Sequence, residues 1–336
     1  MHHRRTLRRF AFTLSAATLV GSVVVPTQAT TLRQRDAAWA APKGFSQAFS
    51  ESSYWNTPLP KNVPIARRSG KIISWLRSDN TFDHIRLPSA SSSGKWGRPI
   101  YWSDSADNGY DIRATKYALP PQMESLNIPA GAMPDPTSDA AMTVYDMESG
   151  HVCGLHKATY NTGKDTWSAA GGDCYSLESN GLHGKLPQSN SPTNTGHRGI
   201  SSGIVGVRWD EYQDREINHV LQISVNTTKC KHVFPMVGDE CGADAKHAPP
   251  EGTRIRIKRS IRLRELRLSP AALMIARALK KYGAVIGDQS GGPAVLKLEN
   301  TVAQGRGQLW DGILSADSLE AMPFDSFEIV RMGYGS

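Results

Sequence analysis

Alternating apolar and polar positions predict that short β-strands make up most of this chain. Residues 205–210 and 217–225 each place apolar side chains at every second position, as half-buried strands do. Residues 141–152 have the pattern of a hairpin that turns at Glu148-Ser149-Gly150. Residues 254–258 predict a further strand, with two isoleucines facing inward and the basic residues on a wet face.

One segment combines the signals that start and stop an α-helix. Ser269 suits the N-cap, Pro270 suits the first helical position, and Gly283 follows the apolar run. A shorter helix is expected at 71–77, a buried strand at 285–288 and a last strand at 324–331. We therefore predict a mainly β fold, namely an antiparallel β-sandwich of the jelly-roll or concanavalin-like type with one or two short helices.

The N-terminus has the features of a secretory signal. Four arginines precede the apolar run 10–25, which is too short to cross a bilayer, and small residues suited to a signal peptidase surround Ala29. The pair Arg8-Arg9 also fits a twin-arginine signal. We expect a signal peptide at 1–29, a linker at 30–51 and a single elaborated β-domain at 52–336, secreted as a monomer.

Removal of the signal changes how the charge is interpreted. The whole chain carries +8, but without the four N-terminal arginines 35 basic residues face 31 acidic ones. A bias this small is weaker than a nucleic-acid-binding protein usually shows. No later stretch approaches the roughly 20 apolar residues of a membrane helix. We therefore expect neither a nucleic-acid partner nor a membrane partner.

The four cysteines agree with export, because an oxidising compartment allows them to pair. Four cysteines allow three pairings, and local spacing favours Cys153 with Cys174 and Cys230 with Cys241. A zinc site is the competing interpretation, although the spacings do not resemble zinc knuckles.

Asp288 is the first candidate for chemistry. Residues 287–293, Gly-Asp-Gln-Ser-Gly-Gly-Pro, look like the nucleophile loop of chymotrypsin-like proteases, but Gln289 separates the aspartate from the serine. The segment is better interpreted as a glycine-rich turn after a buried strand. There Asp288 is either catalytic or a partner of turn amides.

A second candidate group comprises Arg208, Asp210, Glu211 and His219. If their two strands form a hairpin, Glu211 and His219 come within reach of one another. His219 interrupts an apolar face, so it is either a core histidine bonded to a carboxylate or a general base at the edge of a concave sheet.

Residues 181–203 form a long loop of Gly, Ser, Asn, Pro and His. Loops of this length inside a compact domain are usually functional or disordered. His183, His197 and Arg198 give the loop the means to close over an anionic or hydroxylated substrate, although a solvated loop has the same composition.

No cofactor motif is present, and we predict no cofactor. One acidic turn is able to bind Ca²⁺ through its oxygens, but it lacks the EF-hand order of ligands and resembles an ordinary solvated turn. Its polar residues are Asp104, Asp107, Asn108 and Asp111.

Several short motifs together resemble a largely uncharacterised group of secreted bacterial proteins rich in β-strands. They are Tyr54-Trp55-Asn56-Thr57-Pro58, residues 167–177, Arg208-Trp209-Asp210-Glu211, Asn218-His219-Val220-Leu221, and residues 279–283 leading into Gly287-Asp288. The resemblance covers about residues 52–330 and implies a candidate site of Arg208, Glu211, His219 and Asp288. The loop 181–203 departs from the pattern of the group, and the resemblance supplies no substrate.

Export, disulfides, strands and scattered tryptophans, Trp167 among them, suit an enzyme that degrades a polysaccharide substrate. A glycoside hydrolase needs two carboxylates, for which Glu211 and Asp288 are expected. A polysaccharide lyase needs a base, here His219, and a cation such as Arg208 for the uronate carboxylate. The alternatives are a non-catalytic carbohydrate- or cell-wall-binding protein and an extracellular protease.

Overall fold

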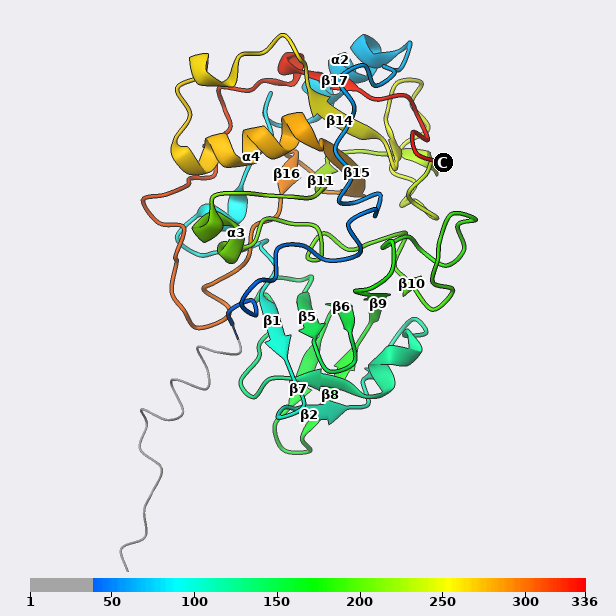
Figure 1. The fold of residues 1–336 in the computed structure, drawn as a ribbon, viewed down its shortest axis with the longest axis vertical. Helices are drawn as coiled ribbons and strands as arrows, with labels where there is room; N and C mark the ends of the chain where they lie inside the picture. The colour runs from blue at the N-terminus through cyan, green and yellow to red at the C-terminus, as the bar shows by residue number, and fades with distance from the viewer. Residues whose placement is uncertain (1–38) are drawn as a thin grey trace, which may run out of the picture.

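The computed structural model describes residues 39–336, in which strands predominate over three α-helices (Figure 1). The predicted signal peptide and residues 30–38 of the predicted linker lie outside the described residues. Within 39–336 no helix is long and apolar enough to cross a membrane. The mainly β prediction is confirmed at this level.

The first of two five-stranded sheets has the order β1-β5-β6-β9-β10. Its strands are β1 (Ile100–Ser103), β5 (Met142–Asp146), β6 (His151–His156), β9 (Gly171–Ser176) and β10 (Thr195–Gly196). β5 and β6 form the predicted hairpin, whereas β1 pairs with β5 in parallel. One face of this sheet packs on a small core that includes Tyr101 and Val144, and the other face joins the main core.

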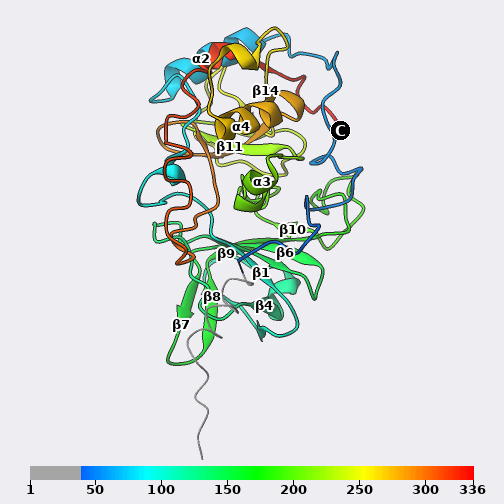
Figure 2. The same ribbon diagram turned by 60° about the vertical axis from the view of Figure 1, so that its left-hand side comes forward.

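The second sheet has the order β16-β11-β15-β14-β17. Its strands are β16 (Val295–Leu296), β11 (Leu221–Val225), β15 (Ala284–Gln289), β14 (Arg254–Ile257) and β17 (Phe327–Ile329). β11 and β15 are parallel neighbours, and the segment that joins them includes α4 (Pro270–Lys281). Figure 1 and Figure 2 show α4 lying beside this sheet in the lobe opposite the first sheet. Both sheets are therefore mixed, which corrects the antiparallel prediction.

Shorter pieces complete the fold. The small sheets comprise β2 (Asn108–Tyr110) with β4 (Leu126–Ile128), β3 (Arg113–Ala114) with β8 (Thr166–Ala169) and β7 (Thr159–Asn161), and β12 (Lys229–His232) with β13 (Pro250–Glu251). The 3₁₀ turns are η1 (Pro88–Ala90), η2 (Pro121–Glu124), η3 (Leu263–Glu265) and η4 (Phe324–Ser326).

Helix α4 forms where capping and amphipathicity agree. The Ser269 hydroxyl accepts the Ala272 N–H at 3.2 Å, Pro270 occupies the first position, and Gly283 follows the helix with φ +78°. The helix buries Ile275 and Leu279 completely. A second predicted helix is present as α2 (Ser69–Asp79).

Two predictions for arginine-bearing segments are wrong. Trp209 and Asp210, expected at the end of a strand, instead begin α3 (Trp209–Asp214), because the Glu211 carboxylate accepts the Arg208 N–H at 2.9 Å and starts a helix. Arg254 and Arg256 on β14 are buried instead of solvated. Arg254 donates to the Tyr282 carbonyl and Arg256 to Glu328, so each buried guanidinium has a partner.

Both predicted disulfides are confirmed, Cys153–Cys174 and Cys230–Cys241. Cys153 and Cys174 stand opposite each other on β6 and β9 and are fully buried in the small core. Cys230 and Cys241 close an exposed loop beside the second sheet.

Candidate functional site

Arg208, Glu211 and His219 form a buried cluster at the start of β11. A Glu211 oxygen lies 2.8 Å from His219 Nε2 and 3.4 Å from Arg208 Nη1. Burial acts to raise the pKa of Glu211, but the Arg208 guanidinium and the contact with His219 lower it. His219 Nδ1 faces the Val220 carbonyl at 2.9 Å, so both ring nitrogens contact protein oxygens and neither is free to meet a substrate.

This cluster lies far from Asp288. Because β11 and β15 are parallel, Asp288 is paired with Ser224, five residues beyond His219. At about 3.3 Å per residue the two ends are about 16 Å apart along the strand. The carboxylates of a glycosidase flank one bond at about 5 to 9.5 Å. The structure therefore does not bring Glu211 and Asp288 together as a hydrolytic pair.

Asp288 instead lines a cavity of about 640 Å³ to which both sheets contribute. Its polar and charged lining consists of Arg98, Tyr117, Asp139, Thr143, His156, Asp173, His197, Arg198, Ser201, Ser202, Glu240, Asp288 and Gln289. Of the predicted site residues, Asp288, His197 and Arg198 meet here.

The first sheet supplies one wall of the cavity through the register of its strands. Gly154 on β6 is opposite Thr143 on β5 and Asp173 on β9, so these three positions form a row across the sheet. His156 is opposite Gly171 in the next row. Residues two apart on a strand share a face, so His156 and Asp173 project to the same side as diagonal neighbours, about 7 to 8 Å apart.

Gly154 leaves the space that this wall needs. A Cβ at this position would lie 2.5 Å from Asp173 Oδ1 and 2.4 Å from the Ser201 hydroxyl. Any side chain here would displace Asp173, which accepts the Ser201 N–H at 2.8 Å. The glycine thus allows the loop that carries His197 to approach the sheet.

Arg198 holds three carboxylates on the opposite wall. Its guanidinium lies 2.6 Å from Asp288, 3.0 Å from Glu251 and 3.3 Å from Glu240. Glu240 and Asp288 are hydrogen-bonding partners, so a shared proton relieves the repulsion between them. Burial raises the pKa of Glu240. Burial also acts to raise the pKa of Asp288, but its interactions with His197 and with the Arg198 guanidinium hold that pKa below its ordinary value.

His197 and His156 are the two imidazoles of the cavity, and both are open to its solvent. Burial and the Arg198 guanidinium lower the pKa of His197, and Asp288 only partly opposes them. Cavity water weakens the effect of burial, but Arg198 and Arg98 act in the same direction. Burial also lowers the pKa of His156. Both rings are therefore neutral bases at neutral pH.

Two further charged groups of the site, the Asp173 carboxyl and the Arg98 guanidinium, come from the first sheet and from the segment before β1. Burial raises the pKa of Asp173 to about 7. Arg98, nine-tenths buried before β1, contacts Asp139 at 3.3 Å through Nη2, while its Nη1 is a buried donor with no hydrogen-bond partner among residues 39–336. Lys297 lies close enough for Arg98 to contribute, after burial, to lowering its pKa to about 8. These features favour an anion beside Arg98.

Other predicted residues lie elsewhere. His183 is buried in its loop, where Nδ1 accepts the Lys185 N–H at 3.1 Å. Trp167 is buried in the small core against Tyr160. Trp55 and Trp102 are also buried, whereas Trp96 is exposed and is therefore the one of these four tryptophans that a sugar ring can reach.

Sequence reasoning missed Arg98, His156, Asp173 and Glu240. The signal that could have found His156 is its place near Cys153, on a segment expected to be a strand. The predicted Cys153–Cys174 bridge brings these segments together, but the sequence did not reveal the register of β6 on β9, which gives Asp173 and His156 one face.

No cluster of three or more His, Cys, Asp or Glu side chains suited to a metal ion occurs among residues 39–336. In the acidic turn, the Asp107 carboxylate accepts the Asp104 N–H at 3.1 Å and the Asp104 carboxylate accepts the Ala106 N–H at 2.8 Å. These carboxylates therefore accept hydrogen bonds from backbone N–H groups of their own turn, as in an ordinary solvated turn.

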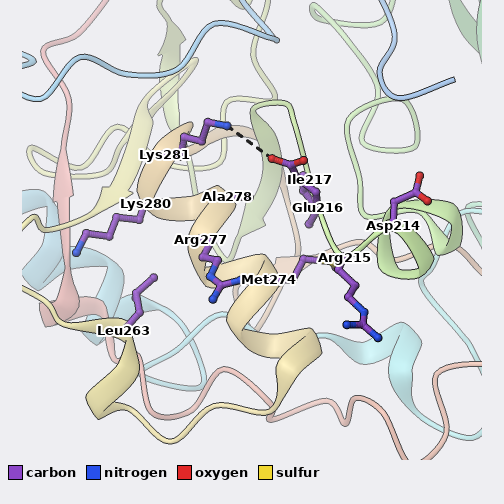
Figure 3. Close-up of a pocket in the computed structure, with 10 residues that line it drawn as sticks. All are labelled: Asp214, Arg215, Glu216, Ile217, Leu263, Met274, Arg277, Ala278, Lys280 and Lys281. Carbon is purple, nitrogen blue, oxygen red and sulfur yellow. Dashed lines mark ion pairs between the residues drawn. The ribbon is translucent and has the colours of Figure 1, made fainter. Parts of the chain in front are cut away.

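A second hollow, of about 600 Å³, lies between α4 and the segment that follows α3. Figure 3 shows its lining, in which the one drawn ion pair joins Lys281 and Glu216 at 3.9 Å. Arg277 and Met274 of α4 also line it. It contains no histidine, so the groups suited to proton transfer lie in the cavity at Asp288.

No protein-family model, curated protein or solved structure matches this chain. The resemblance to secreted bacterial proteins thus stays a prediction, and the functional argument depends on the cavity.

Proposed function

We propose that this chain is a secreted polysaccharide lyase that cleaves chains containing uronic acid in the cavity at His197 and Asp288. The observation that carries the proposal is that Arg98 lines the same cavity as two neutral histidines. The two disulfides fit an extracellular location.

Elimination from a uronate requires a base, a cation and an acid. Arg98 would bind the substrate carboxylate and so make the hydrogen on C5 more acidic. His197 would take that proton, since a neutral imidazole is a base at neutral pH. The electron pair of the C5–H bond then forms the C4=C5 double bond as the C4–O glycosidic bond breaks.

The leaving oxygen needs a proton, and Asp173 is suited to supply it. A carboxyl group with a pKa of about 7 keeps its proton through mildly acidic and neutral pH. Asp288 would orient the His197 ring and stabilise its positive charge, because the two groups interact electrostatically. His197, predicted as a substrate ligand, thus replaces His219 as the proposed base. Arg198, also predicted as a substrate ligand, would instead position Asp288, Glu251 and Glu240.

Hydrolysis is the second candidate, and one observation favours it. The pKa of Asp173 is raised and that of Asp288 is lowered, which is how the acid and base of a glycosidase are separated. The pair Glu240 and Asp288 does not serve this purpose, because groups that share a hydrogen bond are closer than the 5 Å or more a glycosidase needs.

The test incubates the mature protein with neutral and uronate-containing polysaccharides and records new reducing ends and the ultraviolet absorbance of unsaturated uronates. We expect both signals on uronate polymers alone. Reducing ends without unsaturation would replace the lyase with the hydrolase, and binding without either signal would favour the carbohydrate-binding alternative.

Variants locate the chemistry. His197→Ala and Arg98→Ala should each lower kcat/KM at least a hundredfold, because general base catalysis contributes about 10² to 10⁴. His151→Ala is the control, since it removes a histidine of β6 that does not line the cavity. Equal activity in all three variants would remove the cavity as the site.

A further inference from the structure

Two exposed aromatic side chains belong to segments that line the cavity, Tyr117 as a lining residue itself and Trp96 as a neighbour of one. Tyr117 lines it with 58% of its surface exposed, the highest value among the large hydrophobic residues described. Trp96 is 40% exposed and lies two residues before Arg98, which also lines the cavity. Large rings in solvent cost hydration free energy, and their presence at a cavity indicates a ligand surface.

Tyr117 is held beside the floor of the cavity. Its N–H donates to the Ala170 carbonyl at 2.9 Å, and its ring lies 3.4 Å from the position that a Cβ on Gly171 would take. Gly171 is the register partner of His156. The Tyr117 ring therefore stands next to the histidine wall, and a side chain larger than glycine would crowd it.

Trp96 lies on the segment that leads to Arg98. It has φ +67°, a conformation that costs a tryptophan of order 1 kcal/mol or more. The chain that follows it is anchored, because the Arg98 N–H donates to the Leu298 carbonyl and the Arg98 carbonyl accepts from the Asn300 N–H, both at 3.0 Å. The backbone that carries this exposed ring is thus tied to the cavity lining at Arg98.

The segments that carry the two rings meet the first sheet at the ends of one line across it. Arg98 leads into β1, His156 is on β6, and Gly171, beside Tyr117, is on β9. The order β1-β5-β6-β9 separates the outer strands by three spacings, about 14 Å in all. His156 lies on the strand between Arg98 and Gly171, and a span of this size calls for several linked sugar units.

A cation accompanies each ring. Lys116 Nζ lies 4.9 Å from the centre of the Tyr117 ring, and Lys297 Nζ lies 5.6 Å from that of Trp96. A sugar ring packs its C–H face on an aromatic ring, while a carboxylate on that sugar pairs with an ammonium group. Each position therefore combines the two groups that recognise a uronate unit.

We infer that Trp96 and Tyr117 are sugar-stacking positions at the two ends of the cavity, which bind units on either side of the bond that is cut. This inference rests on the proposed function and specifies it: the substrate is a chain of several uronate-containing units, and cleavage occurs inside the chain.

The experiment titrates uronic-acid oligosaccharides of increasing length into the His197→Ala protein by calorimetry, so that binding is measured without cleavage. We expect affinity to rise with length until both rings are covered. Adding Trp96→Ala or Tyr117→Ala should remove that rise and weaken binding of the longest oligosaccharide about tenfold or more, with little change for the shortest. In the active enzyme, the same changes should raise KM more than they lower kcat.

Two controls separate the outcomes. Tyr117→Phe and Trp96→Phe keep an aromatic ring and should retain most of the affinity, and loss equal to the alanine variants would overturn stacking. Phe82→Ala removes an exposed ring that also faces a cation, Arg86 at 4.2 Å, but Phe82 neither lines the cavity nor lies within two residues of a residue that does. If Trp96→Ala and Tyr117→Ala bind and cleave like Phe82→Ala, the inference fails while the lyase stands. A chain that binds and cleaves no uronate polymer overturns the proposed function itself.

Discussion

The residues Arg208, Glu211 and His219 show how one pattern serves structure or catalysis. A histidine on an apolar face, a nearby glutamate and an arginine are also what a catalytic site contains. Here each polar atom of the cluster faces another protein atom, and the Glu211 and His219 side chains are only 2% and 4% exposed. The arrangement therefore supports a role in joining α3 to the start of β11.

Glu211→Gln tests this role through stability. Removal of one partner from a buried ion pair leaves the others uncompensated, so we expect a loss of about 3 to 5 kcal/mol of unfolding free energy. Chemical denaturation of the variant and the wild type measures it. Glu265→Gln is the control, because it breaks the exposed pair with Arg262 at 3.1 Å and should cost about 1 kcal/mol or less. A normally stable Glu211→Gln protein that lacks activity would return Glu211 to the catalytic machinery.

At the scale of elements, the sequence predicted the features that depend on residues close together in the chain. The cap at Ser269, the turn between β5 and β6 and the short cysteine spacings depend on neighbouring residues. The cavity depends instead on strand pairings between distant segments, such as β6 with β9 and β11 with β15. For that reason Asp288 and His197 were predicted singly, while their meeting with Arg98 and Asp173 was not.

The two disulfides have different positions and should differ in what they support. Cys153–Cys174 joins β6 to β9 inside the small core. Cys230–Cys241 closes the loop that carries Glu240, whose N–H donates to Glu251 at 3.0 Å and whose carboxylate accepts the Gln289 N–H at 3.0 Å. This second bridge thus holds one side of the cavity.

Paired serine substitutions separate these effects. Cys153→Ser with Cys174→Ser should lower unfolding free energy by about 2 to 5 kcal/mol, because a crosslink is lost and polar hydroxyls enter the core. Cys230→Ser with Cys241→Ser should cost less stability but lower kcat/KM severalfold, as Glu240 loses its fixed position. Thermal melting and uronate cleavage measure both. Equal effects of the two double variants on each quantity would contradict this division.

At the scale of the whole molecule, the cavity gathers charges that neither sheet holds alone. Asp173 and His156 come from the first sheet, Asp288 from the second, and Arg198 from the loop that follows β10. Burial raises the pKa of Asp173 and of Glu251, each to about 7. Folding therefore depends on the protonation of acids that the cavity needs.

We predict that stability falls as pH rises from about 4 to about 7, and that activity falls as pH rises through about 7. A carboxyl whose folded pKa is raised stabilises the fold fully below its unfolded pKa, near 4, and has lost that contribution once pH passes 7. Activity should fall around pH 7 and above because Asp173 loses the proton it donates. On the acid side activity should persist below pH 6, since the pKa of His197 is lowered. Thermal melts and kcat/KM from pH 5 to 9 measure both curves.

Asp173→Asn separates the two effects because the amide keeps an oxygen for the Ser201 N–H but has no charge to bury. At pH 8 the variant should melt several degrees above the wild type, and at pH 5 the difference should largely disappear. Glu251 titrates in the same range, so part of the pH dependence of stability should remain. The same variant should lose most lyase activity at every pH, since asparagine cannot supply the proton. An Asp173→Asn protein with wild-type activity would exclude Asp173 as the acid, and one that melts lower at pH 8 would show that the charged carboxylate stabilises the cavity.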